Sequence, residues 1–195
     1  MGPRTAERGF REGQMIWNGV LVPSIGGGVC QTATTIFNAA FEAGMPIKDR
    51  LNHSFYISHY PMGRDATVSW GGPDLVFKND LDHAILIKAH GTATTFTVSF
   101  YGTKQKRKVV ATTSEQTNWR SPHLQYAIDP NAPPGSVRTT GGGGPGFDVT
   151  VYRKVFEDGK LIRRDKFVSR YTPENPTAVY GAGSTPPGPY FYLPG

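Results

Sequence analysis

The stretch GGGVCQTATTIFNAAFEAG, residues 26–44, decides how the rest of the chain is arranged. Its apolar residues recur every three or four positions, which predicts a helix with one buried face. Gly44 and Pro46 stand at its far end, and both residue types are typical of a helix end. We therefore expect one long helix, whose buried face consists of Val29, Ala33, Ile36, Phe37, Ala40 and Phe41.

The chain has one cysteine, Cys30, which falls in the first turn of this predicted helix and follows three closely placed glycines. The unpaired N–H groups and the positive dipole end of a helix favour an anion at that place. A thiol there tends towards a lowered pKa and towards reactivity. The alternative is that Cys30 is a small buried apolar residue and that the glycines only permit close packing. No Gly-Lys-Ser/Thr follows, so the glycines do not fit a phosphate-binding loop.

The length of 195 residues suits one domain or two small ones. Runs rich in Thr, Val, Tyr and Phe, separated by many glycines and prolines, predict a β-rich fold. The net charge of +6 permits an anionic partner, such as nucleic acid, an acidic wall polymer or a membrane surface. The basic residues are scattered, however, and the densest run, 104–108, is short. With no stacking platform or groove-reading helix visible, we do not expect nucleic-acid binding.

A single cysteine excludes an intrachain disulfide, which suits a cytosolic protein or one secreted by an organism that does not rely on disulfides. No apolar stretch is long enough to span a membrane. Residues 1–15 are charged rather than signal-like. We expect an upstream signal or anchor to be missing from this sequence, so its absence says little about location.

Two hairpins are predicted from their turn residues, Asn18-Gly19 and Asp158-Gly159, because these pairs adopt positive φ at little cost. Charged residues of the second hairpin, Arg153 among them, are expected on a solvated sheet face or on a surface for an anionic or sugar polymer. Residues 129–146 are expected to be loop. Further strands are predicted at Phe55, Ile57 and Val68, and over 74–77, 84–89 (buried), 94–101 and 109–113.

A cysteine nucleophile needs a base and usually a third group that orients the base. His53 and His59 are candidate bases, and their even spacing would put both on one face of a regular strand. Spacing does not decide between them. Asp65 is a candidate to orient the base, and Arg64 to hold a substrate carboxylate through its forked guanidinium, unless the two form an ordinary turn salt bridge. One cysteine and scattered histidines match no zinc spacing, so we expect no metal and no cofactor.

Several motifs resemble the VanW family, which is named for vancomycin-resistance gene clusters and found on bacterial cell surfaces. They are GPRTAERGF at 2–10, VPSIGGGVCQTATTIFNAAFEAG at 22–44, NHSFYISHYPMGRDATVSWGG at 52–72 and FKNDLDHAILIKA at 77–89. Residues 107–181 resemble, more weakly, the five-glycine (G-five) module that often follows VanW and is thought to bind N-acetylglucosamine polymers or to act as a spacer.

The resemblance implies an α+β protein at the cell surface or in the cell wall. It divides the chain into a β-rich VanW domain with one central helix over 1–105, an all-β module over 106–182 and an extended tail over 183–195. Its implied partners are peptidoglycan stem peptides and glycan, with no nucleic acid and no membrane span in this chain.

The resemblance also implies an activity, because some VanW proteins have been proposed as cysteine-dependent L,D-transpeptidases that make 3→3 cross-links in peptidoglycan. Carried over, Cys30 is the nucleophile, His53 the base, and Asp65 or Arg64 the orienting or binding group. His59 ranks below His53, because a Tyr is expected there in many relatives. Substrate-binding roles are then expected for Arg64, His59, Gln31 and Gly28.

Two other functions remain open from the sequence. One is a cysteine carboxypeptidase or endopeptidase that acts on the same stem peptides. The other is a non-catalytic peptidoglycan-binding surface protein in which Cys30 merely packs.

Overall fold

The computed structural model describes residues 2–194, and in that range one α-helix stands among fourteen strands. The expected strand-rich fold with a single long helix is thus confirmed, and Cys30 lies in the first turn of that helix. The helix α1 spans Val29–Glu42, after a 3-10 turn at Ala6–Arg8. The strands are β1 Glu12–Trp17, β2 Val20–Ile25, β3 Ile47–Asp49, β4 Val76–Phe77, β5 Leu86–Gly91, β6 Phe96–Tyr101, β7 Arg107–Thr113, β8 Thr117–Arg120, β9 Gln125–Ile128, β10 Val137–Thr140, β11 Gly146–Glu157, β12 Lys160–Tyr171, β13 Thr177–Tyr180 and β14 Tyr190–Tyr192.

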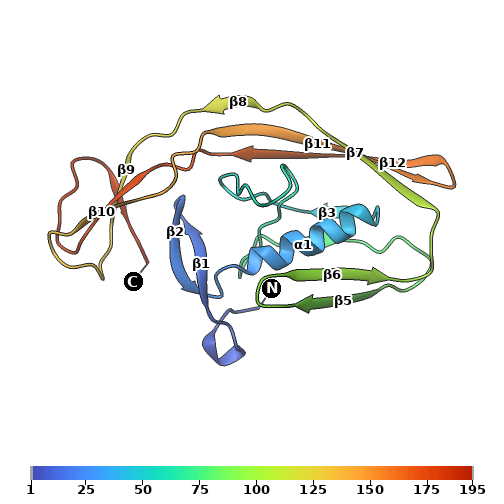
Figure 1. Cartoon of the computed structure of the whole chain (residues 1–195), viewed down its shortest axis with the longest axis horizontal. Helices are drawn as coiled ribbons and strands as arrows, with labels where there is room; N and C mark the ends of the chain where they lie inside the picture. The colour runs from blue at the N-terminus through green and yellow to red at the C-terminus, as the bar shows by residue number, and fades with distance from the viewer. Residues whose placement is uncertain (1, 195) are drawn as a thin grey trace.

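The helix lies between two hairpins, with β11–β12 arching over one side and β5–β6 on the other (Figure 1). Its apolar stripe forms the main core with Ala66 and Val68 from the following loop and Val151 from β11. Phe37 and Phe41 are fully buried there. Gly44 ends the helix with φ of 67°, a left-handed conformation that favours glycine.

The predicted hairpins are both present. β1 pairs with β2 across Asn18-Gly19, and β11 pairs with β12 across Asp158-Gly159, with all four turn residues at positive φ. β7 adds a third strand antiparallel to β11. β11 alternates between a buried face and an outer face, as its sequence predicts.

Arg153 is where the solvated-face prediction is wrong, because it lies on the inner face of β11 and is only 1% exposed. Its guanidinium donates to the backbone carbonyls of Phe41 and Met45 at 2.9 and 2.8 Å and pairs with Asp165. It also stacks on the Phe41 ring, 4.7 Å from the ring centroid. Carbonyls at a helix end lack helical partners. Arg153 therefore ties the end of α1 to the sheet.

We expect Arg153→Met to lower the free energy of unfolding by about 3–5 kcal/mol, because Asp165 loses the closer of its two cations and the Phe41 and Met45 carbonyls lose a buried charged donor. Urea denaturation measures this loss. Lys154→Met is the matched control, since Lys154 is exposed on the same strand. Equal losses in the two variants would contradict the role of Arg153.

A second sheet has the order β10–β13–β9–β14, and the β1–β2 hairpin packs against it. The shared core combines Val20 and Val22 of β2 with Ala127, Val179 and Leu193. Core residues therefore come from both sides of the predicted boundary near residue 105. The domain limits at residues 105 and 182 remain a prediction that describes sequence modules, and they do not describe separately packed cores.

Four local expectations are corrected. Residues 50–75 form a loop without strands, so the strand positions Phe55, Ile57 and Val68 are wrong, although Phe55 and Val68 are buried. Strand β5 exists but is exposed throughout, because β6, and not β5, lies against α1. Residues 129–146 include β10, and the predicted tail includes β14, which pairs in parallel with β9.

Candidate active site

The start of α1 is fixed by a close crossing of two backbones. A Cβ placed on Gly27 would lie 2.2 Å from the Gly13 carbonyl oxygen of β1, so no side chain fits there. The Gly28 N–H donates to the Gln14 carbonyl at 3.0 Å, and Gly28 has φ of 80°. The glycines thus permit close packing, and the same packing holds Cys30 at a fixed place beside β1.

Cys30 lines a cleft with a volume of about 1270 Å³. The start of α1, the β1–β2 hairpin, the loop over residues 51–60 and part of β12 line this cleft. Cys30 is half-buried, so its sulfur is neither sealed in the core nor fully in solvent. His53 and Tyr60 lie in the wall beside it.

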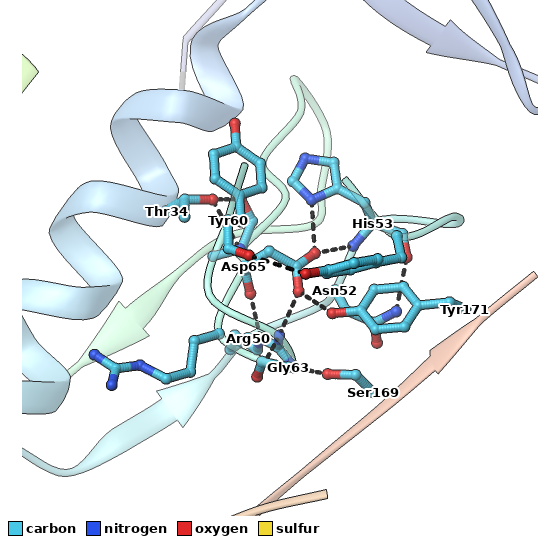
Figure 2. Close-up of polar contacts among 12 residues, drawn as sticks. Thr34, Arg50, Asn52, His53, Tyr60, Gly63, Asp65, Ser169 and Tyr171 are labelled. Atoms are coloured by element: carbon cyan, nitrogen blue, oxygen red, sulfur yellow. Dashed lines mark hydrogen bonds and ion pairs between the residues drawn. The ribbon is translucent and has the colours of Figure 1, made fainter. Parts of the chain in front are cut away.

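Arg50 holds the loop that carries His53 and Asp65 (Figure 2). Its guanidinium donates to the backbone carbonyls of Gly63 and Asp65 and to the Ser169 hydroxyl of β12. It also forms an ion pair with the Asp65 carboxylate at 2.9 Å. The loop has no regular secondary structure, and the buried Arg50 guanidinium fixes its path.

Asp65 is 3% exposed and accepts hydrogen bonds on both carboxylate oxygens. One oxygen takes the Arg50 guanidinium and the Tyr171 hydroxyl, at 2.9 and 2.5 Å. The other takes the backbone N–H and the ring Nδ1 of His53, both at 2.7 Å. Burial would raise the pKa of Asp65, but these donors hold that pKa below its ordinary value, so the carboxylate stays charged.

His53 is oriented by this carboxylate and by Tyr60, whose ring stacks on the imidazole at 5.6 Å. Its second ring nitrogen points away from Asp65 (Figure 2), and the ring interacts with Cys30, which lines the same cleft. Burial lowers the pKa of His53, but Asp65 and Cys30 outweigh burial and raise that pKa to about 9. The imidazole is therefore protonated at neutral pH.

The Cys30 sulfur lies 3.6 Å from the Val68 carbonyl oxygen, which accepts from the thiol when it is protonated. Burial would raise the pKa of Cys30, but the hydrogen bond and charge of His53, with the charge of Arg4, lower it. The negative charge of Cys30 in turn adds to burial in raising the pKa of Tyr60 to about 12. These shifts favour a thiolate–imidazolium pair.

The raised pKa of His53 predicts a pH dependence of stability in Cys30→Ala, where the thiol no longer titrates. Folded His53 keeps its proton above the ordinary pKa of 6.5, because Asp65 still accepts from it. Its stabilising contribution is therefore full below pH 6.5 and is lost as the pH rises through the folded pKa, which lies below about 9 in this variant because Cys30 no longer raises it. Urea denaturation across this range should show the loss in Cys30→Ala and not in Cys30→Ala/His53→Gln. Identical slopes would contradict the shift.

The first turn of α1, which holds Cys30, leaves backbone donors unpaired. Among residues 2–194 the N–H groups of Val29 and Cys30 have no acceptor. The N–H of Gln31, by contrast, donates to the Gly28 carbonyl at 3.0 Å. An oxyanion hole formed by the N–H groups after Cys30 therefore fits less well than one formed by Val29 and Cys30 themselves.

The structure brings His53 between Cys30 and the buried Asp65. The predicted site residues that line the cleft are Gly28, Cys30, Gln31, His53 and His59. His59 is exposed in a turn against the Tyr60 ring, and the shared-strand argument for it fails because the segment is a loop.

Arg64 does not line the cleft. It bonds to Asn38 and Glu42 of α1 and stacks on Phe41, which matches a structural ion pair rather than a substrate contact.

Sequence reasoning missed Arg50, Tyr60 and Tyr171 as parts of this arrangement. Tyr171 lies 106 positions from Asp65, and no local pattern connects the two. Tyr60 stands directly after His59, where an aromatic residue beside two candidate bases was a usable signal.

Within the described part of the chain, no group of three or more His, Cys, Asp or Glu side chains is placed to hold a metal ion. Over the same residues, no helix is both long and apolar enough to cross a bilayer.

Fold and site together define a strand-rich protein with a cysteine, a histidine and an aspartate gathered at one cleft. The chain belongs to the VanW family, since the model described as "VanW like protein" matches residues 1–101. It is similar to the uncharacterized protein YoaR of Bacillus subtilis (strain 168), with 41% identity over 101 residues, 52% of this chain and 33% of that protein. The chain thus spans about a third of the length of this curated relative.

The IgA1 protease G5 domain structure aligns over its whole length with 44% of this chain, at 17% identity and a TM-score of 0.20. That score supports no argument about the fold. The G-five-like assignment of the second half continues to rest on its sequence motifs.

Proposed function

We propose that this chain is a cell-wall L,D-transpeptidase that acts on peptidoglycan stem peptides through a Cys30 thioester. One observation carries the proposal: Asp65 bonds to the His53 ring, and His53 interacts with Cys30 at an open cleft. It is the arrangement that cysteine acyl transfer needs: a nucleophile, a base and a group that orients the base.

In the first half-reaction, the Cys30 thiolate attacks the carbonyl carbon of the third stem residue. The N–H groups of Val29 and Cys30, which have no acceptor among residues 2–194, stabilise the oxyanion that forms. The C–N bond to the terminal residue then breaks, and the His53 imidazolium gives its proton to the leaving amine. Thioester and neutral imidazole remain.

In the second half-reaction, the side-chain amine of a neighbouring stem attacks the thioester carbonyl. His53, now neutral, accepts the proton that this amine loses. The C–S bond breaks, the thiolate is restored, and a peptide bond between two third residues is formed. No oxidant, metal or nucleotide enters this sequence.

The test is incubation of the protein with a disaccharide-tetrapeptide, followed by mass spectrometry. A cross-linked dimer with loss of the terminal residue is expected, and Cys30→Ala should give none. A trimmed monomer without dimer would show a cysteine peptidase instead. No product from folded protein would overturn the catalytic proposal and leave a wall-binding protein.

The location follows the same proposal, since its substrate lies outside the cytoplasm. We place the chain at the cell surface or in the wall, with the second half as a glycan-binding or spacing module. Fractionation of cells and detection of the chain in the wall fraction would check this placement.

A further inference from the structure

Arg4 is a cation at the edge of the cleft whose side chain is fixed by packing. Its methylene groups lie against Gly26, where an added Cβ would come within 2.6 Å of the Arg4 Cβ and 2.9 Å of its Cδ. Its Nη1 donates to the Gly26 carbonyl at 3.2 Å. Gly26 stands just before the first turn of α1, so Arg4 is held beside the start of the helix that carries Cys30.

The charge of Arg4 has no partner among residues 2–194. Seven other arginines of that range form ion pairs with carboxylates, namely Arg50, Arg64, Arg107, Arg120, Arg138, Arg153 and Arg163. Arg4 makes none there, although it is half-buried. A guanidinium has five N–H donors, and the Gly26 carbonyl takes only one contact.

The charges around the cleft suit an anionic ligand. Besides the Cys30 thiolate and the His53 imidazolium, whose charges offset each other, the charged residues that line it are Arg4, Arg170 and Glu174. Glu174 accepts from the Gly142 N–H at 3.0 Å, so part of its charge is already engaged. Arg64, expected from the sequence to hold a carboxylate, bonds to α1 outside the cleft.

We propose that Arg4 forms a carboxylate subsite, which binds the C-terminal carboxylate of the residue that leaves when the thioester forms. This subsite rests on the proposed function. The leaving residue follows the attacked carbonyl directly, so its carboxylate lies one residue, about 3.8 Å between Cα atoms, along the stem. Arg4 and Cys30 line the same cleft, and Gly26, which Arg4 contacts, stands four residues before Cys30. A forked guanidinium matches two carboxylate oxygens.

The subsite has a consequence for specificity. A substrate with a free C-terminus one residue beyond the attacked carbonyl provides a carboxylate that pairs with the Arg4 guanidinium. An internal peptide bond or an amidated C-terminus leaves the cation half-buried and unpaired. Cleavage should therefore be confined to the terminal residue of the stem, for transfer and for hydrolysis alike.

The first test needs no turnover, because it compares alkylation of Cys30 by iodoacetate, an anion, with alkylation by neutral iodoacetamide. The ratio of the two rate constants cancels the thiolate fraction. We expect Arg4→Gln to lower this ratio about fivefold, since one nearby charge is removed. Arg4→Lys should keep most of it, and Arg8→Gln, which removes an exposed charge in the same segment, should leave it unchanged.

The second test measures binding in the Cys30→Ala background, where no thioester forms. A tetrapeptide stem with a free C-terminal carboxylate is expected to bind about tenfold more tightly than its C-terminal amide, as fits a charge-assisted pair. Arg4→Gln should abolish this difference, and Arg4→Lys should restore part of it.

The outcomes separate this subsite from the transpeptidase proposal. Equal affinities for carboxylate and amide, or an alkylation ratio that Arg4→Gln does not change, would overturn the subsite. Preference for the carboxylate without any dimer in the cross-linking assay would overturn transpeptidation and leave the subsite in place.

Discussion

His53→Gln is expected to lower kcat/KM for cross-linking by about 10³–10⁴-fold, close to the upper range for loss of a general acid–base group. The reason is that His53 provides both the cation that holds the thiolate and the proton for the leaving amine. Glutamine can keep a hydrogen bond to Asp65 and fills similar space. Initial rates of dimer formation measure the effect.

His59→Gln is the matched control for the choice of base. His59 lines the same cleft but is exposed and lies against Tyr60 rather than Asp65. Its substitution should change the rate less than about threefold, within the scatter of exposed sites. A larger loss of rate in His59→Gln than in His53→Gln would assign the base to His59 and contradict the role of His53 between Asp65 and Cys30.

Asp65→Ala is expected to lower the free energy of unfolding by about 3–5 kcal/mol, as for the loss of one partner from a buried ion pair. It leaves Arg50 without its carboxylate and Tyr171 and the His53 backbone N–H without an acceptor. The loop that carries the base would then loosen, so activity should fall as well. Urea denaturation measures the stability loss.

Asp49→Ala is the control for this loss, because Asp49 is exposed at the end of β3, one residue from Arg50. It should change the free energy of unfolding by less than about 0.5 kcal/mol. Asp65→Asn keeps the volume and removes the charge, and should fall between the two. A stability loss in Asp65→Ala no larger than that in Asp49→Ala would contradict the central place of this carboxylate.

The helix, both hairpins and the place of Cys30 could be predicted from local chemistry. Helical spacing of apolar residues marks α1, and Asn-Gly and Asp-Gly mark the turns. Cys30, His53 and Asp65 could be selected because their residue types match acyl transfer and their motifs match a family. Their contact, however, depends on a loop whose path no periodicity describes.

The rest depends on partners far away in the sequence. Arg153 is buried because it donates to carbonyls at the end of α1, which lies against the inner face of β11. Strand alternation alone does not show on which face of the strand these carbonyls lie. Tyr171 reaches Asp65 from β12 for a similar reason. Arg64 was the natural candidate for a carboxylate from its motif, but Glu42 and Asn38 on α1 already bond to it.

The pairing of the Cys30 thiolate with the His53 imidazolium is tested most directly by the rate of Cys30 alkylation with iodoacetamide as a function of pH. Rapid alkylation with an apparent pKa below the ordinary thiol value of about 8.5 is expected, with a rise of that pKa in His53→Gln. Slow alkylation with a pKa at or above 8.5 in both proteins would contradict the pairing and leave Cys30 a packing residue.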